Sequence, residues 1–172
     1  MRNVFVIAAN SVSSADVPNA RLGQRFGRMD LTSQLALLAV QPLAGSLAAF
    51  ARDRIAVILA ARTSSLATDV EYWKGRDNPG GPSPTLFTYT LPSAALGEIA
   101  IRHRLTGPGL CFVSGGDELV AEATDLLGRG EADACVCVIA DVVSPALAEM
   151  ISAPPVATAR AFLVRRDEHS PK

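Results

Sequence analysis

Residues 84–141 read PTLFTYTLPSAALGEIAIRHRLTGPGLCFVSGGDELVAEATDLLGRGEADACVCVIAD, and the alternation of patterns in this stretch decides the fold class. It predicts a helix over Ser93–Leu105, closed by a glycine-proline turn, and then a short strand over Leu110–Val113. A second helix over Asp117–Leu127 ends at glycine and precedes an apolar run, Ala134–Ala140, typical of a strand buried on both faces. This alternation indicates a mostly parallel sheet with crossover helices.

The remainder of the chain continues the alternation. Further strands are predicted over Val4–Ala8, Arg54–Ala60 and Thr158–Val164. A helix is predicted over Leu31–Phe50, where Asp30 caps the start and Pro42 kinks the helix or splits it in two. Two more helices are predicted, one that begins at Thr63, Ser64 or Ser65 and ends at about Trp73, and one over Pro145–Ile151. Arg76–Thr85 is predicted to be a loop. We expect an α/β fold with a mixed, mostly parallel sheet of about five strands. It forms one domain over residues 1–164, followed by a charged, flexible tail over residues 165–172.

Composition narrows the range of functions. The 172 residues carry a formal net charge of -1, so no overall positive field exists to bind nucleic acid. No apolar run reaches the ~18–20 residues that cross a bilayer, and we expect a cytoplasmic protein without a membrane span. A hydrophobic fraction of 49% against a charged fraction of 19% indicates either a large core or an apolar face that a partner subunit covers.

The cysteines and the absent motifs exclude several kinds of site. Three cysteines are an odd number and do not predict a disulfide framework. Cys135 and Cys137 alternate along an apolar run, so they face the same side of a strand and are interpreted as core residues. The sequence contains no Walker loop, no G-x-G-x-x-G and no H-E-x-x-H. We therefore expect neither a cofactor nor a metal ion.

Several short motifs occur in a fixed order along the chain. They are Arg28-Met29-Asp30, Pro84 with Phe87, Thr90 with Pro92, Ile99-Ala100, Leu105, Gly107-Pro108, and Gly130 with Asp133. Their order and spacing resemble the N-terminal half of the β-ketoacyl synthases, which belong to the thiolase-like proteins. The resemblance covers Pro84–Asp141 and, more weakly, Met29–Ala61. It implies that the domain is one thiolase-like half.

The nucleophile of that family is a cysteine on the turn after the strand that follows the Gly-Pro. A thiol at such a strand-to-helix corner is activated by the N-terminus of the helix. Here the turn reads Ser114-Gly115-Gly116-Asp117, so the position falls on Gly115 or Gly116, and neither can form an acyl thioester. Ser114 is interpreted as a helix cap, and Cys111, on the preceding strand, as a packing residue.

The resemblance also implies that condensation needs histidines from a second half, which would follow the end of this sequence. Only His103 and His169 occur here. We expect a structural or surface role for His103 and a place in the tail for His169. Because no Cys–His–His set can be assembled, we expect no catalysis by this chain alone.

The resemblance further implies a partner. In the family, the strand that bears the nucleophile pairs antiparallel with its mate across a dimer. The corresponding interface strand here consists of Leu110, Cys111, Phe112 and Val113. Its partner is a full-length β-ketoacyl synthase in a heterodimer or a second copy of this chain in a homodimer.

The implied role is that of a non-catalytic subunit, a chain-length-factor-like or stabilising partner of an active ketosynthase. Its pathway would be fatty-acid-like, polyketide or polyene synthesis on acyl carrier protein. Phe87 and Tyr89 either line an acyl tunnel or pack in the core. Two alternatives remain: a small acyltransferase or decarboxylase of the thiolase superfamily using Cys111 or Ser114, and an acyl-binding module that works alone.

Overall fold

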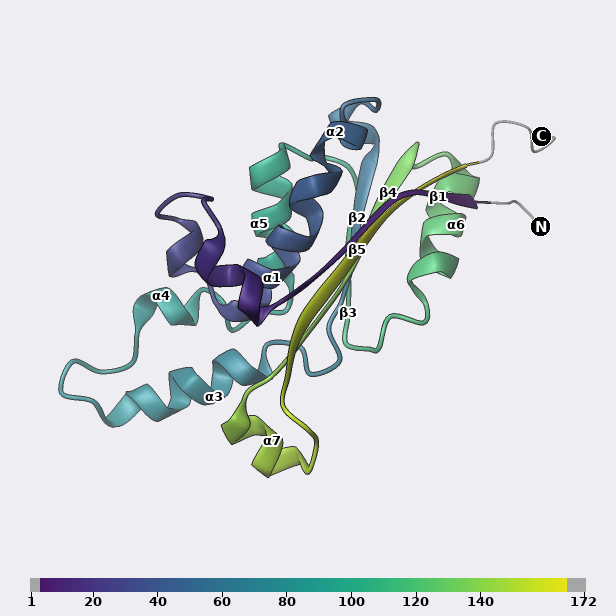
Figure 1. Cartoon of the computed structure of the whole chain (residues 1–172). Helices are drawn as coiled ribbons and strands as arrows, with labels where there is room; N and C mark the ends of the chain where they lie inside the picture. Colours follow the sequence, from purple (N-terminus) through teal and green to yellow (C-terminus); the bar gives the residue numbers. More distant parts are fainter. Residues whose placement is uncertain (1–3, 167–172) are drawn as a thin grey trace.

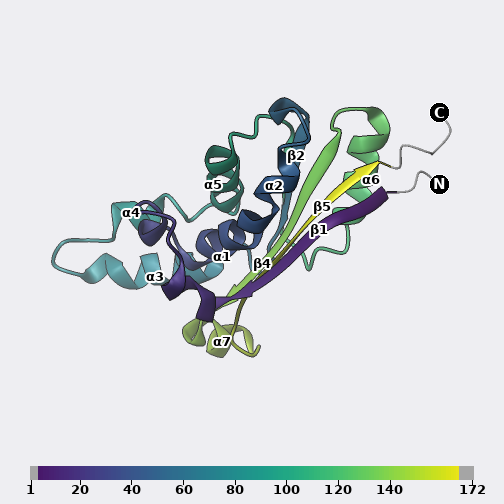
Figure 2. The ribbon, with the colours of Figure 1, turned by 45° about the horizontal axis from the view of Figure 1, so that its top comes forward.

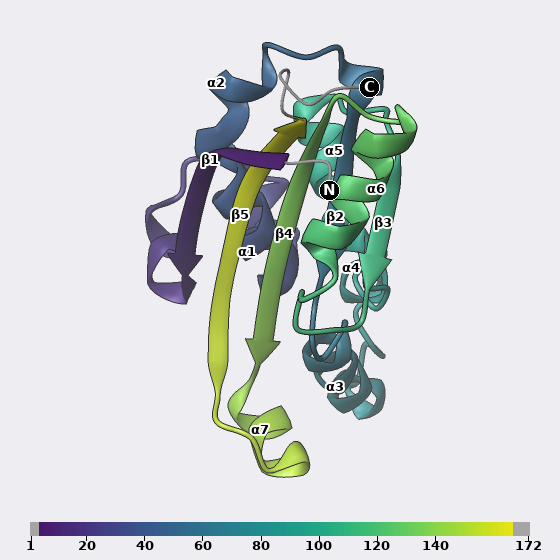
Figure 3. The same cartoon turned by 90° about the vertical axis from the view of Figure 1, so that its right-hand side faces the viewer.

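A five-stranded mixed sheet forms the centre of the computed structural model, which describes residues 4–166. The strands are β1 (Val4–Ser13), β2 (Ile55–Ala60), β3 (Gly109–Phe112), β4 (Ala134–Val143) and β5 (Val156–Arg166). Their order across the sheet is β1-β5-β4-β2-β3, as Figure 3 shows with the sheet turned towards the viewer. β2 runs parallel to β3 and β4, whereas β5 runs antiparallel to β4 and β1. Four strands therefore point one way and only β5 opposes them, which confirms the predicted fold class.

Helices cover both faces of the sheet. α1 (Leu31–Val40), α2 (Ala44–Leu47) and α5 (Ser93–His103) lie on one face, and α6 (Leu119–Arg129) lies on the other (Figure 1, Figure 2). Three further helices, α3 (Leu66–Lys74), α4 (Pro84–Phe87) and α7 (Pro145–Ile151), lie towards one end of the molecule. Since α3 follows β2 and α7 follows β4, this is the end at which the parallel strands finish. In the part of the chain that the structure describes, no helix is long and apolar enough to cross a membrane.

The apolar residues form two clusters, one on each face of the sheet. The larger cluster lies between the sheet and α1 and includes Leu35, Leu59 and Ile99. The smaller cluster lies under α6 and includes Ile58 and Leu119. β2 contributes alternate residues to both clusters, and all six of its residues are buried. Burial on both faces is the reason that this strand reads as a continuous apolar run.

The long helix expected after Asp30 is broken at the proline. Asp30 caps α1 by accepting a hydrogen bond from the Ser33 backbone N–H at 3.0 Å, as predicted. α1 ends at Val40, and a 3-10 turn over Gln41–Leu43 leads into α2. Pro42 lies inside that turn, because its ring and its missing N–H are incompatible with the interior of an α-helix.

Three strands, β1, β4 and β5, are longer than the apolar pattern predicts, and β4 runs on to Val143. β1 continues through polar residues to Ser13, where it pairs with β5 at the edge of the sheet. One of these residues, Asn10, donates its side-chain N–H to the Ala39 carbonyl of α1 at 3.2 Å. β5 extends to Arg166, so the expected start of the tail at Arg165 is corrected by two residues, and the rest of the tail lies outside the described residues. α4 likewise begins at Pro84, inside the expected loop.

Two motif residues have clear structural roles. A Cβ atom at Gly107 would lie 2.3 Å from the Ile55 carbonyl oxygen, so only glycine lets this turn approach the start of β2. Asp133 accepts hydrogen bonds from Arg54 at 2.9 and 3.3 Å, and Arg54 also donates to the Gly130 carbonyl at 2.7 Å. These contacts fix the connection between α6 and β4 against the start of β2.

Candidate functional site

The predicted nucleophile corner lies where the parallel strands β2, β3 and β4 end. In open α/β sheets this end is the usual position of binding and catalytic groups. The strand ends are tied together by hydrogen bonds: the Arg62 backbone N–H donates to Asp141 at 2.9 Å, and the Thr63 hydroxyl donates to the Val142 carbonyl at 3.1 Å. The corner itself, Ser114-Gly115-Gly116, connects β3 to α6.

A side chain at Gly116 would be strained in this geometry. Its φ of +93° lies in the region that residues with a Cβ atom rarely adopt. A Cβ atom there would also lie 2.7 Å from both Cγ1 and Cδ1 of Ile139 on β4. At Gly115, by contrast, the nearest atom would be a guanidinium nitrogen of Arg62 at 3.5 Å, which is an ordinary contact. The backbone and the Ile139 side chain therefore both disfavour a side chain at Gly116, whereas Gly115 leaves space for one.

Ser114 stabilises the turn and does not cap the helix. Its hydroxyl donates to the Glu118 carboxylate and accepts a hydrogen bond from the Gly116 backbone N–H at 3.2 Å. The N-cap of α6 is Glu118, whose side chain makes no capping hydrogen bond. The interpretation of Ser114 as the helix cap is thus wrong, because two further residues of turn separate the glycines from the first residue of α6.

Cys111 lies on the side of the sheet opposite α6. It packs against the cluster around α1 and α5, whereas its neighbours Leu110 and Phe112 pack against the cluster under α6. Burial raises the pKa of the Cys111 thiol, which disfavours the thiolate that a nucleophile requires. The thiol is therefore separated from the corner by the thickness of the sheet.

The other two cysteines are core residues on the α6 side of β4. Cys135 and Cys137 both belong to the cluster under α6, and their thiols approach the carbonyls of Ala123 and Leu119 at 3.8 and 3.9 Å. Burial raises the pKa of Cys135 to about 12 and that of Cys137 still further. They face the same side of the strand, as the alternation predicts.

No histidine lies at the corner among the described residues. His103 ends α5 and is half-buried, and burial, followed by the nearby positive charges of Arg102 and Arg52, lowers its pKa. His169 lies outside the described residues. Across residues 4–166, no group of three or more His, Cys, Asp or Glu side chains is placed to hold a metal ion.

β3 forms one edge of the sheet and has only β2 as a neighbour within the described chain. The Pro108 carbonyl accepts a hydrogen bond from Val57 of β2 at 2.9 Å, and the Phe112 carbonyl accepts one from Ala61, directly after β2, at 3.0 Å. Because backbone groups of alternate residues point to opposite sides of a strand, the N–H and C=O groups of Cys111 point away from β2. Val113, directly after β3, has a side chain that is 65% exposed. The predicted interface strand therefore lies on an open edge that can accept another strand.

The two aromatic residues predicted for a tunnel have different surroundings. Phe87 is exposed and packs against Tyr72, with ring centroids 5.4 Å apart. Tyr89 is buried, and its hydroxyl donates to Glu98 at 3.1 Å. A shared tunnel lining stays a prediction.

The sequence did not predict that Ile139 lies at the corner. Ile139, which closes the space beside Gly116, belongs to an apolar run in which nothing distinguishes it from its neighbours. No sequence spacing relates Ile139 to the turn at residues 114–116. The contact between them exists only because β4 pairs with β2, which brings Ile139 beside Gly116 in the folded chain.

No family model matches the chain, and no curated protein matches it by sequence. Its fold is nevertheless similar to several solved structures. The ishigamide ketosynthase/chain length factor has a TM-score of 0.76 at 21% identity, over 98% of this chain and 63% of that chain. A ketosynthase in complex with its chain length factor from Xenorhabdus doucetiae has a TM-score of 0.72 at 17% identity, over 97% and 80%. A type II polyketide synthase acyl-carrier protein in complex with its ketosynthase has a TM-score of 0.73 at 13% identity, over 98% and 64%.

These similarities show that the chain has the fold found in ketosynthase and chain length factor structures. The chain spans less than two thirds of the length of the first and third of those proteins. It therefore corresponds to a part of them, and the described residues of this part form the five-stranded sheet.

Proposed function

We propose that this chain is a non-catalytic β-ketoacyl-synthase-like subunit that pairs with an active ketosynthase. Its role is that of a chain length factor or a stabilising partner in fatty-acid-like, polyketide or polyene synthesis. The single observation that carries the proposal is the corner, where the glycines at 115 and 116 supply no nucleophile and Gly116 is strained against any side chain by its backbone and by Ile139. A protein that keeps this fold without a nucleophile at the corner has the architecture of a partner and not of the enzyme.

The edge of β3 supports pairing with another subunit. An open strand edge offers unpaired N–H and C=O groups to a second strand. Several large apolar side chains are also exposed on segments that follow the ends of the parallel strands; they are Leu66, Trp73, Val113, Met150 and Ile151. Exposed apolar side chains at one end of the sheet suit a surface that a partner covers. Because ketosynthases have the same fold, one of them is the partner that we propose.

The proposal extends to the surroundings of the subunit. The carrier of the growing chain would be an acyl carrier protein that meets the ketosynthase partner, and no cofactor is required of this chain. We place the protein in the cytoplasm, since its three cysteines are free and thiols stay reduced there.

Co-expression with the β-ketoacyl synthases of the same organism tests the proposal. We expect the chain to co-purify with one of them and the distribution of product lengths or the yield to change when the chain is omitted. If the chain is a stable monomer that none of these synthases retains, the proposal is refuted.

Two substitutions at one residue test the interface strand. Cys111→Pro removes an N–H that points away from β2, so the sheet keeps its hydrogen bonds while the edge loses a donor. Cys111→Ala removes the thiol and keeps the N–H, and it serves as the matched control. We expect the proline variant to lose the ketosynthase and the alanine variant to retain it, with both variants folded by circular dichroism. Equal retention by both variants would exclude β3 from the interface.

The hydrogen bond between Ser114 and Glu118 favours a second candidate function, an acyltransferase that uses the serine. A carboxylate that accepts the hydroxyl proton would act as a general base. This function requires a covalent acyl-serine when the purified chain is incubated with an acyl thioester. Intact-mass measurement of the wild type and of Ser114→Ala decides the question, and we expect no adduct on either protein.

A further inference from the structure

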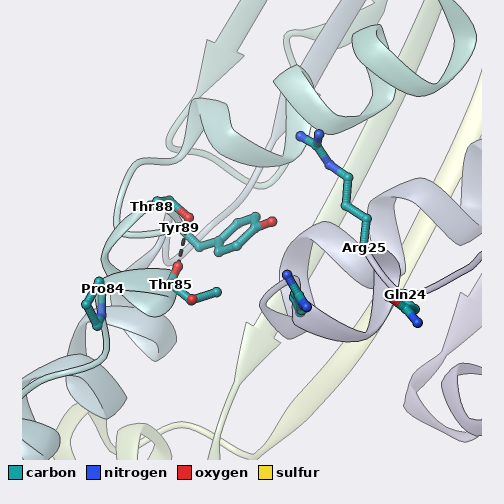
Figure 4. Close-up of a pocket in the computed structure, with 7 residues that line it drawn as sticks. Gln24, Arg25, Pro84, Thr85, Thr88 and Tyr89 are labelled. Atoms are coloured by element: carbon teal, nitrogen blue, oxygen red, sulfur yellow. Dashed lines mark hydrogen bonds between the residues drawn. The ribbon is translucent and has the colours of Figure 1, made fainter. Parts of the chain in front are cut away.

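A cleft of about 630 Å³ lies between the segment that precedes α1 and the short helix α4 (Figure 4). The residues that line it come from the segment before α1, from α4 and from the two residues that follow α4; they are Gln24, Arg25, Arg28, Pro84, Thr85, Thr88 and Tyr89. Two of them are arginines, and none is an aspartate or a glutamate. The lining thus combines two positive charges with hydroxyl and amide groups.

Arg25 is held in place by the buried carboxylate of Glu98, to which Tyr89 also donates. Its Nε and one Nη donate to the two carboxylate oxygens of Glu98 at 3.0 and 2.9 Å. Glu98 and Tyr89 are 7% and 8% exposed, and the Tyr89 hydroxyl donates to the same carboxylate at 3.1 Å. Figure 4 shows the Tyr89 ring extending towards Arg25. The second Nη of Arg25 is not used by Glu98 and keeps its N–H groups available.

Arg28 supplies a charge that nothing in the described part of the chain neutralises. Its side chain is exposed and makes no hydrogen bond or ion pair within residues 4–166. Glu98 balances the charge of Arg25, so the cleft as a whole retains the charge of Arg28. The hydroxyl of Thr85 and the side-chain amide of Gln24 lie in the same lining and can donate further hydrogen bonds.

We infer that this cleft binds a phosphate group. Guanidinium groups form charge-assisted hydrogen bonds to phosphate, and hydroxyl and amide donors complete such sites. A phosphate group could belong to a small molecule or to a partner protein, and the chemistry of recognition is the same for both. The inference is independent of the proposed pairing with a ketosynthase, because it concerns binding by this chain alone.

Titration of the purified chain with inorganic phosphate tests the inference. Two-dimensional NMR of backbone and arginine Nε–H signals at constant ionic strength reports the binding. We expect saturable shifts that centre on Arg25, Arg28 and Thr85. Arg28→Gln should weaken binding by about tenfold or more, because a hydrogen bond to a charged group contributes at least the free energy of one tenfold step. Arg28 is exposed and unpaired, so its replacement leaves the fold intact.

Arg21→Gln is the matched control. Arg21 lies in the same exposed segment but does not line the cleft, and the substitution changes the net charge equally. We expect its affinity for phosphate to stay within about twofold of the wild type. Shifts that do not saturate, or an equal loss in the two variants, would show a diffuse electrostatic effect and overturn the inference. Parallel titrations with coenzyme A and with a phosphoserine peptide then show whether a small molecule or a protein carries the phosphate.

Discussion

The strain at Gly116 makes a quantitative prediction about Gly116→Ala. Its φ of +93° costs a residue with a Cβ atom about 1–2 kcal/mol. The new Cβ atom would lie 2.7 Å from two atoms of Ile139, and such overpacking costs about 1–3 kcal/mol. We therefore expect Gly116→Ala to lower the free energy of unfolding by about 2–5 kcal/mol.

A double-mutant cycle with Ile139→Ala separates the two contributions. Ile139→Ala removes both atoms that the new Cβ would meet, so in that background only the backbone cost of about 1–2 kcal/mol remains. The coupling free energy between the two substitutions should therefore be about 1–3 kcal/mol. Equilibrium unfolding in urea, followed by circular dichroism at 222 nm, measures all four corners of the cycle.

Gly97→Ala is the control for the effect of adding a methyl group to a glycine. Gly97 lies inside α5 with nothing within 4 Å of an added Cβ atom, so alanine should stabilise the protein by about 0.5–1 kcal/mol. If Gly116→Ala is as harmless as Gly97→Ala, the argument against a side chain at Gly116 fails. If the two substitutions in the cycle are additive within about 0.5 kcal/mol, Ile139 does not hinder a side chain there.

Three further predictions concern the residues that stabilise the fold. Gly107→Ala should destabilise the protein by about 2–4 kcal/mol, because its Cβ would meet a backbone carbonyl that cannot move aside; an unchanged urea midpoint would contradict this. The hydrogen bond from Arg54 lowers the pKa of Asp133 in the folded protein. The ion pair therefore stabilises the fold at pH values above the pKa of Asp133 in the unfolded chain, which is about 4, and this stabilisation is lost as the pH falls through the folded pKa. Asp133→Asn should therefore flatten the decline of the urea midpoint between about pH 5 and pH 2, and parallel curves for the two proteins would exclude this role. Glu98→Ala leaves the buried Tyr89 hydroxyl without its acceptor and should cost about 1–3 kcal/mol, whereas Glu98→Gln keeps an acceptor and should cost less; thermal unfolding of both variants distinguishes the two effects.

The class of fold was accessible from the chain because the relevant signals are local. β2 and β4 are buried on both faces, and such burial requires continuous apolar runs that stand out in the sequence. Asp30 and Pro42 mark the beginning and the break of the first helix through the hydrogen bonds that each can or cannot make. The second half of β1 was missed because an edge strand with one exposed face tolerates polar residues and has no such run.

The absence of a nucleophile could also be predicted, but the strain that a side chain would meet at Gly116 could not. The turn Ser114-Gly115-Gly116 contains no cysteine, and this is plain from the sequence. Which glycine faces Ile139 depends on the backbone torsion at the corner and on the position of β4. The serine was assigned to the wrong hydrogen bond for the same reason, since the length of the turn before α6 is not encoded in any single residue.

The sequence by itself determined the order of strands and helices along the chain, the apolar core and the lack of a catalytic thiol at the corner. These properties depend on the character of neighbouring residues, which periodicity and turn chemistry report directly. Only the tertiary structure decided that β3 lies at an open edge, that Cys111 faces away from α6, and that Arg25 and Arg28 share a cleft with α4. Such arrangements arise from packing between segments that are far apart in the chain. Local sequence patterns do not indicate which distant segment a residue will contact.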